Sequence, residues 1–345
     1  MTSYAFWNNK GGVGKSFLCF VAACEYAHRN PNSDVYVIDL CPQGNVSETL
    51  LGGYEISPKA MRDMLANIPR ATVAGYLEAR LSSPFKMILD VSPYICRPCD
   101  RNPDIPINLR LVCGDNLLEL LAEAIRQTSQ LAIPVDAWRQ VLSWIQDLCG
   151  ALTDLSGDRD AMFVIDCNPS FAIYTQLALA AADFVVVPFT ADDSSRRGIE
   201  NVVALLYGVG PDAHTSTYAR ISFSKRAKEE RLSTPKLHSF VSNRVTLYEG
   251  QASRAFAAVT ITIKKTMDDI HEKHRSFFSQ PKMRPSETFV EIPDYHSACI
   301  VSSMTGTPLH KMKAGPRLIA GERVQINQQP LQRYRDALNN FVDTL

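Results

Sequence analysis

Residues 6–16 read FWNNKGGVGKS, and this stretch decides the fold. A loop of Gly, four residues and then Gly-Lys-Ser or Gly-Lys-Thr binds phosphate when it lies between a strand and a helix. Here the apolar run YAFW precedes the loop, and the helical pattern KSFLCFVAACEYA follows it. One position departs from the pattern: Asn9 replaces the first glycine, and a second lysine, Lys10, comes next.

The residue types in the loop indicate how it would hold a nucleotide. Gly11, Gly12 and Gly14 let backbone N–H groups turn toward an anion without a Cβ clash, and the helix N-terminus adds its dipole. We expect Lys15 to reach the β- and γ-phosphates and the Ser16 hydroxyl to ligate Mg²⁺.

Short runs rich in β-branched and aromatic residues recur along the chain. They are nearly continuous apolar stretches, which is typical of strands covered on both faces. Helical patterns lie between them, at 115–127 and 137–152 for example. The alternation predicts an α/β fold: a doubly wound, mostly parallel sheet with helices on both faces. The expected strands are 3–7, 34–40, 107–113, 161–167, 183–189, 236–243 and 287–293.

Two of these strands end in an aspartate. VYVIDL places Asp39, and FVIDC places Asp166, at the carboxyl end of a strand, where a doubly wound sheet binds its ligands. Together with Ser16 they form a candidate Mg²⁺ site. We expect the cofactors to be ATP and Mg²⁺.

These residues resemble a known family. KGGVGKS resembles the deviant Walker A loop of the ParA/MinD-type P-loop ATPases, IDLCPQGNVSETL their switch I segment, and VIDCNPSFAIYTQLALAAADFVVVPF their switch II segment. The Gln-Gly-Asn after the proline places the resemblance nearest the ParA branch. VSNRV and VEIPDYHSACIVSSMTGTPL resemble the late segments that contact the base. The resemblance implies nucleotide contacts from Gly11, Gly12, Val13, Gly14, Lys15, Ser16, Phe17, Asn243 and Pro293.

The resemblance also implies a role for the second lysine. By analogy Lys10 reaches the phosphates bound by another subunit, like an arginine finger supplied in trans. ATP would then hold together a face-to-face homodimer. The expected catalytic set is Lys10, Lys15, Asp39 and Asp166.

Switch I departs from the family pattern in one respect. Where relatives carry Asp-x-Asp, the second acid is Cys41 here. A thiol of ordinary pKa is mostly neutral at pH 7 and is a poor Mg²⁺ ligand. In switch II, Asn168 stands where relatives have proline; it could orient a water, and a plain loop role is the favoured alternative. The sequence therefore predicts an ATPase with slow turnover.

Composition sets the broad class. The chain has 345 residues, 46% hydrophobic and 21% charged, which are ordinary globular values. Neither a signal peptide nor a membrane span is expected. Nine cysteines, several within apolar runs, favour reduced thiols in the cytoplasm. Cys96 and Cys99 have zinc-knuckle spacing, so a structural zinc or an iron–sulfur cluster shared between subunits stays open.

The net charge of zero hides an asymmetry. Residues 211–345 contain 20 Lys and Arg against 13 Asp and Glu. The family resemblance implies nonspecific DNA binding by such residues on the dimer, with association to the nucleoid; a solvated face with scattered lysines is the alternative. The candidates are Lys225, Arg226, Lys228, Arg231, Lys264, Lys265, Lys273, Arg275, Lys311, Lys313 and Arg317.

The expected organisation is one P-loop ATPase domain over 1–345. A mostly helical elaboration is expected at about 53–106, and a basic, exposed segment at about 211–235. The function that follows is a ParA-type ATPase that positions or segregates DNA or another cargo, stimulated by an adaptor protein. Two alternatives remain: a nucleotide-gated switch with vestigial hydrolysis, and a metal-cluster carrier.

Overall fold

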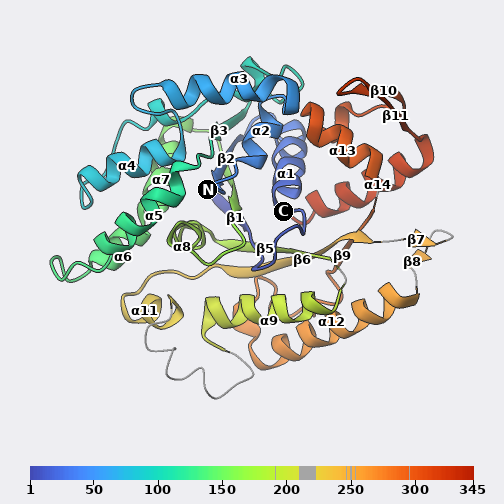
Figure 1. Ribbon diagram of the computed structural model, residues 1–345. Helices are drawn as coiled ribbons and strands as arrows, with labels where there is room; N and C mark the ends of the chain where they lie inside the picture. The colour runs from blue at the N-terminus through green and yellow to red at the C-terminus, as the bar shows by residue number, and fades with distance from the viewer. Residues whose placement is uncertain (191, 210–222, 246, 249–250, 253, 295) are drawn as a thin grey trace.

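A seven-stranded sheet forms the centre of the protein, in the order β3-β2-β4-β1-β5-β6-β9 (Figure 1). The structure is a computed structural model, and it describes residues 1–190, 192–209, 223–245, 247–248, 251–252, 254–294 and 296–345. Every neighbouring pair of strands in the sheet is parallel. The strands are β1 Thr2–Phe6, β2 Asp34–Leu40, β3 Leu109–Val112, β4 Ala161–Cys167, β5 Phe184–Phe189, β6 Lys236–Val245 and β9 Val290–Pro293. The expected α/β class is therefore confirmed.

Successive side chains of each strand alternate between two cores. Ala5, Trp7 and Ile38 belong to one core, whereas Phe6 and Val37 belong to the other. This period of two is a consequence of strand geometry. Strands β1, β2, β4 and β5 are buried along almost their whole length, which explains the continuous apolar runs in the sequence.

Helices cover the two faces (Figure 1). The face packed by the first helix holds α1 Lys15–Arg29, α2 Asn45–Leu50, α3 Gly53–Ala66, α13 His296–Thr305 and α14 Gln328–Val342. The opposite face holds α4 Val73–Ser82, α5 Leu117–Thr128, α6 Ala137–Leu142, α7 Trp144–Ser156, α8 Ile173–Ala181, α9 Asp193–Tyr207, α11 Phe223–Glu229 and α12 Arg254–Lys273. Short 3₁₀ turns occur at Ser92–Tyr94, Pro98–Asp100, Arg275–Phe277 and Leu309–Lys311.

Some local expectations need correction. The single helix expected over 137–152 is two helices, α6 and α7, separated at Ser143. A hairpin of β10 Gly315–Ile319 and β11 Glu322–Ile326 was not foreseen, and a second small antiparallel pair joins β7 Leu247–Tyr248 to β8 Gln251–Ala252. Of the basic segment expected at 211–235, residues 211–222 lie outside the described part. No helix in the described ranges is both long and apolar enough to span a bilayer.

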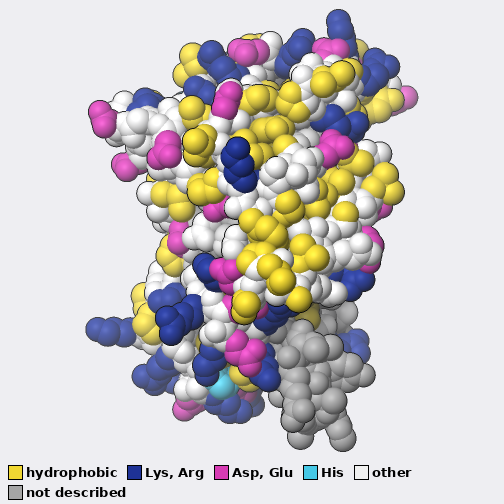
Figure 2. Space-filling model, turned by 90° about the vertical axis from the view of Figure 1, so that its left-hand side faces the viewer, with side chains coloured by type: hydrophobic (Ala, Val, Ile, Leu, Met, Phe, Trp, Pro, Cys, Tyr) yellow, Lys and Arg dark blue, Asp and Glu magenta, His cyan; other side chains and the backbone are white. Residues whose placement is uncertain are grey.

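Basic side chains gather at one end of the molecule. Figure 2 shows many Lys and Arg side chains at its lower end, where α9, α11 and α12 lie, and others at its upper end. Two of the basic residues on α11 are paired with acids, Lys225 with Glu229 and Arg226 with Glu230, which dilutes the positive charge there. The exposed basic residues of this end include Lys228, Arg231, Lys265, Lys273, Arg275, Lys282 and Arg284.

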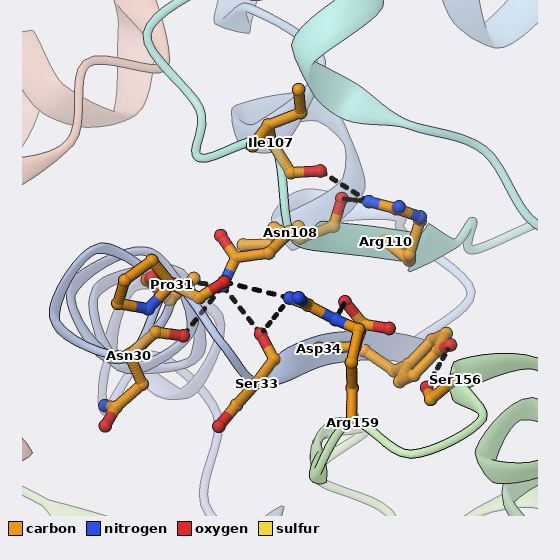
Figure 3. A network of polar contacts seen from close by, with 12 residues as sticks. Asn30, Pro31, Ser33, Asp34, Ile107, Asn108, Arg110, Ser156 and Arg159 are labelled. Carbon is orange, nitrogen blue, oxygen red and sulfur yellow. Dashed lines mark hydrogen bonds and ion pairs between the residues drawn. The ribbon is translucent and has the colours of Figure 1, made fainter.

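A buried amide fastens the loop after α1 to the start of β3 (Figure 3). The Asn108 side chain donates to the carbonyl oxygens of Ala27, Asn30 and Ser33, at 3.1, 3.0 and 2.7 Å. Arg159 also donates to the Ser33 carbonyl oxygen, at 3.2 Å. The network lies where β2 begins, so it fixes the entry of the chain into the sheet.

We expect Asn108→Ala to destabilise the protein. Three carbonyl groups would lose a donor at a position where Asn108 is only 6% exposed. A loss of about 2–4 kcal/mol in the free energy of unfolding is expected, measured by urea unfolding. The control is Asn116→Ala, because Asn116 is exposed and its side chain does not cap α5. Equal stability of both variants and the wild type would contradict the assignment.

Candidate functional site

The glycine-rich loop joins β1 to α1 in the conformation that the sequence predicts. Gly12 and Gly14 have φ of 74° and 88°, in the left-handed region that favours glycine. Helix α1 then begins at Lys15 with no side-chain cap and no acid in its first turn. The N–H groups of that first turn have no intrahelical partner, so they form a ready site for an anion.

Lys15 is turned back onto its own loop. Its Nζ donates to the carbonyl oxygen of Lys10 at 2.9 Å and, more weakly, to that of Asn8 at 3.4 Å. The side chain is buried, and burial lowers the pKa of Lys15, partly opposed by the nearby charge of Asp166. The Lys15 ammonium group, which the sequence assigns to phosphate, is thus hydrogen-bonded to backbone carbonyl oxygens instead.

Asp39 and Asp166 lie side by side on neighbouring strands. They are register partners on β2 and β4, and both are fully buried. Strand alternation directs both side chains to the face that α1 covers, because Val37 and Val164 belong to that core. The two expected metal-site acids are therefore brought together next to the loop.

The two carboxylates differ in how they are supported. Asp39 accepts hydrogen bonds from the Cys41 N–H at 3.0 Å and from the Ser47 hydroxyl at 2.6 Å. Asp166 is buried without a hydrogen bond of good geometry to either oxygen. Ser16 lies close enough to lower the pKa of Asp166, so these two expected metal-site residues are neighbours.

The electrostatics of the Asp39 and Asp166 pair match those of a cation site. Burial raises the pKa of Asp39 to about 6, although Ser47 and the Cys41 N–H lower it. Burial, followed by the charge of Asp39, raises the pKa of Asp166 to about 8. Two adjacent carboxylates are costly to ionise together without a positive partner. Hard oxygen ligands and unpartnered buried oxygens fit Mg²⁺ held through Ser16, Asp39 and Asp166.

Lys10 points to a different partner within the chain. Its Nζ forms an ion pair with the Asp192 carboxylate and donates to the Thr190 hydroxyl, at 3.1 Å for the latter. Partial burial raises the pKa of Asp192, but the hydrogen bonds from Lys10 and Ser194 outweigh it and hold that pKa below its usual range. Asp192 also caps α9 by accepting from the Ser195 N–H. The lysine is thus held by an acid of its own subunit.

Three expected nucleotide contacts are positioned around the loop. Asn243, near the end of β6, donates from its amide to the Val13 carbonyl oxygen at 3.1 Å, and a Cβ at Gly14 would come within 2.1 Å of that amide nitrogen. Phe17 stacks on Tyr334 with ring centroids 6.4 Å apart. Pro293 ends β9, and its register partner lies on β6. Asn243 therefore contacts the loop, Phe17 lies in the first turn of α1 that follows it, and Pro293 pairs with Val245, two residues beyond Asn243.

Cys41 is buried near the carboxylates. Burial, with the charge of Asp39, raises the pKa of its thiol to about 12, so the group is neutral. The Asn168 amide approaches the Cys41 sulfur at 4.0 Å, while its oxygen accepts from Ser170. The Asn168 side-chain oxygen is therefore hydrogen-bonded within its own loop.

The other cysteines do not assemble a metal centre in the described residues. There, no group of three His, Cys, Asp or Glu side chains converges on one point. Cys96 pairs through its backbone with Leu111, and Cys99 approaches Asp100 at 3.8 Å.

Several residues of the site were not foreseen. Ser47 supports Asp39, and Asn8, which is fully buried, accepts from the Lys10 N–H and donates to the Pro188 carbonyl oxygen. The Asp-Asp-Ser-Ser run before the apolar spacing of α9 is an N-cap signal, so Asp192 could have been read as a cap. No sequence signal links it to Lys10.

Comparison with known proteins places this arrangement in context. No family model and no curated protein sequence matches the chain. Among solved structures, apo McdA of Cyanothece matches with a TM-score of 0.58, 14% identity and 98% of each chain covered. A putative plasmid partition protein of Borrelia burgdorferi bound to AMPPNP matches with a TM-score of 0.55, 16% identity, and 100% and 99% covered.

The chain has the fold of McdA and of these plasmid partition proteins. A further McdA structure, a complex with ATP, matches with a TM-score of 0.58 and 14% identity over 100% of this chain and 95% of that one. McdA and the Borrelia protein share the whole length of the chain, so the fold resemblance includes the helices outside the central sheet.

We expect Asp166→Asn to stabilise the metal-free protein at alkaline pH. Because the pKa of Asp166 is about 8 in the folded state and about 4 in an unfolded chain, the folded state binds the extra proton between these values. Stability therefore falls as pH rises through this window, and the neutral amide removes that loss. The melting temperature in EDTA should rise by several degrees at pH 8.5 and change little at pH 5. The control is Asp269→Asn, on the exposed surface of α12. A pH profile parallel to the wild type would refute the charge assignment.

Proposed function

We propose that the protein is a ParA-type ATPase that binds ATP·Mg²⁺ and dimerises around it. The observation that carries the proposal is the buried pair Asp39 and Asp166 beside a loop that holds two lysines, Lys10 and Lys15. The buried pair needs a cation, and each lysine holds a contact within its own subunit that phosphate could replace. ATP with Mg²⁺ satisfies both requirements.

Solved structures with the same fold support the nucleotide. One of these structures is a complex of an aspartate-to-alanine variant of McdA with ATP, and another is the putative Borrelia partition protein bound to AMPPNP. In this chain Lys15 would exchange the carbonyl oxygens of Lys10 and Asn8 for phosphate, and the first turn of α1 would supply N–H donors. Mg²⁺ would neutralise phosphate charge, with Ser16, Asp39 and Asp166 holding it directly or through its waters.

In the proposed dimer, Lys10 leaves Asp192 and reaches the nucleotide of the other subunit. The ion pair with Asp192 is partly exposed, with side-chain exposures of 27% and 46%, so breaking it is inexpensive. A desolvated triphosphate is a stronger partner for an ammonium group than one carboxylate. Nucleotide would therefore control association of the subunits.

The proposed task is segregation or positioning of DNA or another cargo, with a partner protein that stimulates hydrolysis. The basic end around α11 and α12 supports nonspecific DNA binding through phosphates, which would be strongly salt-dependent. Doubling the subunits would double this surface, so DNA binding would strengthen with dimerisation.

A second candidate function is a nucleotide-gated switch with vestigial hydrolysis. Cys41 favours it, because a buried neutral thiol cannot replace a carboxylate near the metal shell. The two candidates differ in turnover, not in nucleotide binding or dimerisation.

Lys10→Ala tests the dimer. Nucleotide affinity should stay within about threefold of the wild type, because Lys15 and the loop backbone remain. The variant should no longer dimerise in the presence of ATP and Mg²⁺. Analytical ultracentrifugation with a labelled nucleotide measures this association. Lys15→Ala is the matched variant and should lose nucleotide binding itself. A Lys10→Ala protein that still dimerises fully would refute the proposal.

Asp192→Asn should have the opposite effect. Asparagine is as good an N-cap as aspartate, so α9 keeps its cap, while Lys10 loses its ionic partner. Dimerisation should then require about three- to tenfold less ATP, an effect of about 0.7–1.4 kcal/mol. Unchanged ATP dependence would show that the ion pair does not compete with association.

Cys41→Asp tests the reason for slow turnover. A carboxylate at this position would restore a water-positioning group, and hydrolysis should rise by about tenfold or more. The measurement is steady-state phosphate release, with and without DNA. Cys41→Ser serves as the matched variant that adds no charge and should stay slow. No gain from Cys41→Asp would mean that another group orients the water.

A further inference from the structure

The hairpin β10–β11 and the carboxyl half of α13 border two adjoining hollows (Figure 1 shows these elements beside α3). The cavity volumes are about 660 Å³ and about 170 Å³, and both hollows are lined by Thr305 and Leu318. The two hollows therefore adjoin at these residues. We call the two hollows together the hairpin groove.

The larger part of the hairpin groove is cationic. Lys311, Lys313 and Arg317 line it, with Asp104 as the acid on its wall. Within the described residues, none of these three cations forms an ion pair with a carboxylate. Elsewhere on the surface, bases such as Arg226 are matched by nearby acids. An unmatched cluster of this kind attracts an anionic partner.

The smaller part of the hairpin groove is lined mainly by apolar residues, with Glu55 as the acid among them. Tyr54 and Ile56 from α3 and Leu318 from the hairpin line it, and they are 64%, 45% and 72% exposed. Covering exposed apolar surface is favourable by about 25 cal/mol per Å². An apolar hollow next to a cationic one calls for a partner that carries both kinds of group.

We propose that the hairpin groove binds an acidic segment of a partner protein, with an apolar side chain in the smaller hollow. Its carboxylates face Lys311, Lys313 and Arg317, and its apolar anchor packs on Leu318. DNA would satisfy the cations but leave Tyr54 and Ile56 uncovered, so the chemistry favours a peptide. This deepens the proposed function, which requires a protein partner, although the chemistry of the groove does not depend on ATP.

The hairpin groove is connected to the nucleotide site through packed elements. A Cβ on Gly306, just after α13, would come within 2.3 Å of the Thr49 carbonyl oxygen of α2. Asn102 donates to the Gly306 carbonyl oxygen at 2.8 Å and to that of Leu50 at 3.4 Å. Helix α2 also contains Ser47, the hydrogen-bond donor to Asp39. A peptide in the hairpin groove would thus contact a segment that packs against α2, the helix that supports Asp39 through Ser47.

The test mixes the full chain, without nucleotide, with a fluorescein-labelled peptide of repeated Glu-Glu-Leu. Binding is measured by fluorescence anisotropy at low salt. A second peptide replaces Leu with Ser, a third replaces Glu with Lys, and a labelled random-sequence DNA duplex is the fourth probe. The Glu-Glu-Leu peptide should bind, and the other two peptides should bind at least about tenfold more weakly. Because nucleotide is absent, failure of ATP-driven dimerisation leaves this result readable.

Two protein variants locate the binding. The triple variant Lys311→Glu, Lys313→Glu and Arg317→Glu should lose at least about tenfold in affinity for the Glu-Glu-Leu peptide. The charge-matched triple variant Lys265→Glu, Lys282→Glu and Arg284→Glu should keep it. Leu318→Ser, at a position that is 72% exposed, should weaken binding of the Glu-Glu-Leu peptide and leave binding of the Ser-containing peptide unchanged.

Three outcomes would overturn the inference. The first is an equal loss of affinity for the Glu-Glu-Leu peptide in both triple variants, which would mean that the attraction is nonspecific. The second is DNA binding that depends on Lys311, Lys313 and Arg317 while peptide binding does not. The third is the absence of measurable binding of the Glu-Glu-Leu peptide to the wild type.

Discussion

Two carboxylates buried side by side determine how the rest of the site is built. Asp39 and Asp166 are register partners next to the last residue of neighbouring strands, and Asp39 accepts hydrogen bonds from Ser47 and the Cys41 N–H. Their raised pKa values show that the fold tolerates this charge poorly without a cation. The glycine loop, Lys15 and the N-terminus of α1 supply the positive potential on one side. A metal–triphosphate ligand would complete the arrangement, because it brings both signs of charge at once.

The two lysines of the loop are both satisfied within the subunit. Lys15 binds backbone oxygens, and Lys10 binds Asp192. Each contact is one that phosphate can replace. The contact of Lys10 matters more for assembly, since Asp192 caps α9 and so ties the lysine to an element on the opposite face of the sheet from α1. In the proposed dimer, closure would exchange a solvent-screened ion pair for a buried one across the interface.

Much of the fold could be predicted from local sequence because a strand covered on both faces has a distinctive composition. The seven expected strands are all present, and Asp39 and Asp166 could be placed because they end two of them. What escaped prediction depends on contacts between distant segments. The pairing of Lys10 with Asp192 and the support of Asp39 by Ser47 leave no pattern in the sequence. The hairpin β10–β11 lacks the strong apolar alternation that marks a buried strand, since most of its residues are exposed or half-buried.

The position of Lys10 in a nucleotide complex tests the central claim most directly. A crystal or cryo-EM structure with AMPPNP and Mg²⁺ would show it. The account predicts a dimer in which the Lys10 ammonium has left Asp192 and lies about 2.7–2.9 Å from a phosphate oxygen of the nucleotide on the partner subunit. A nucleotide-loaded monomer, or a dimer in which Lys10 still binds Asp192, would contradict it.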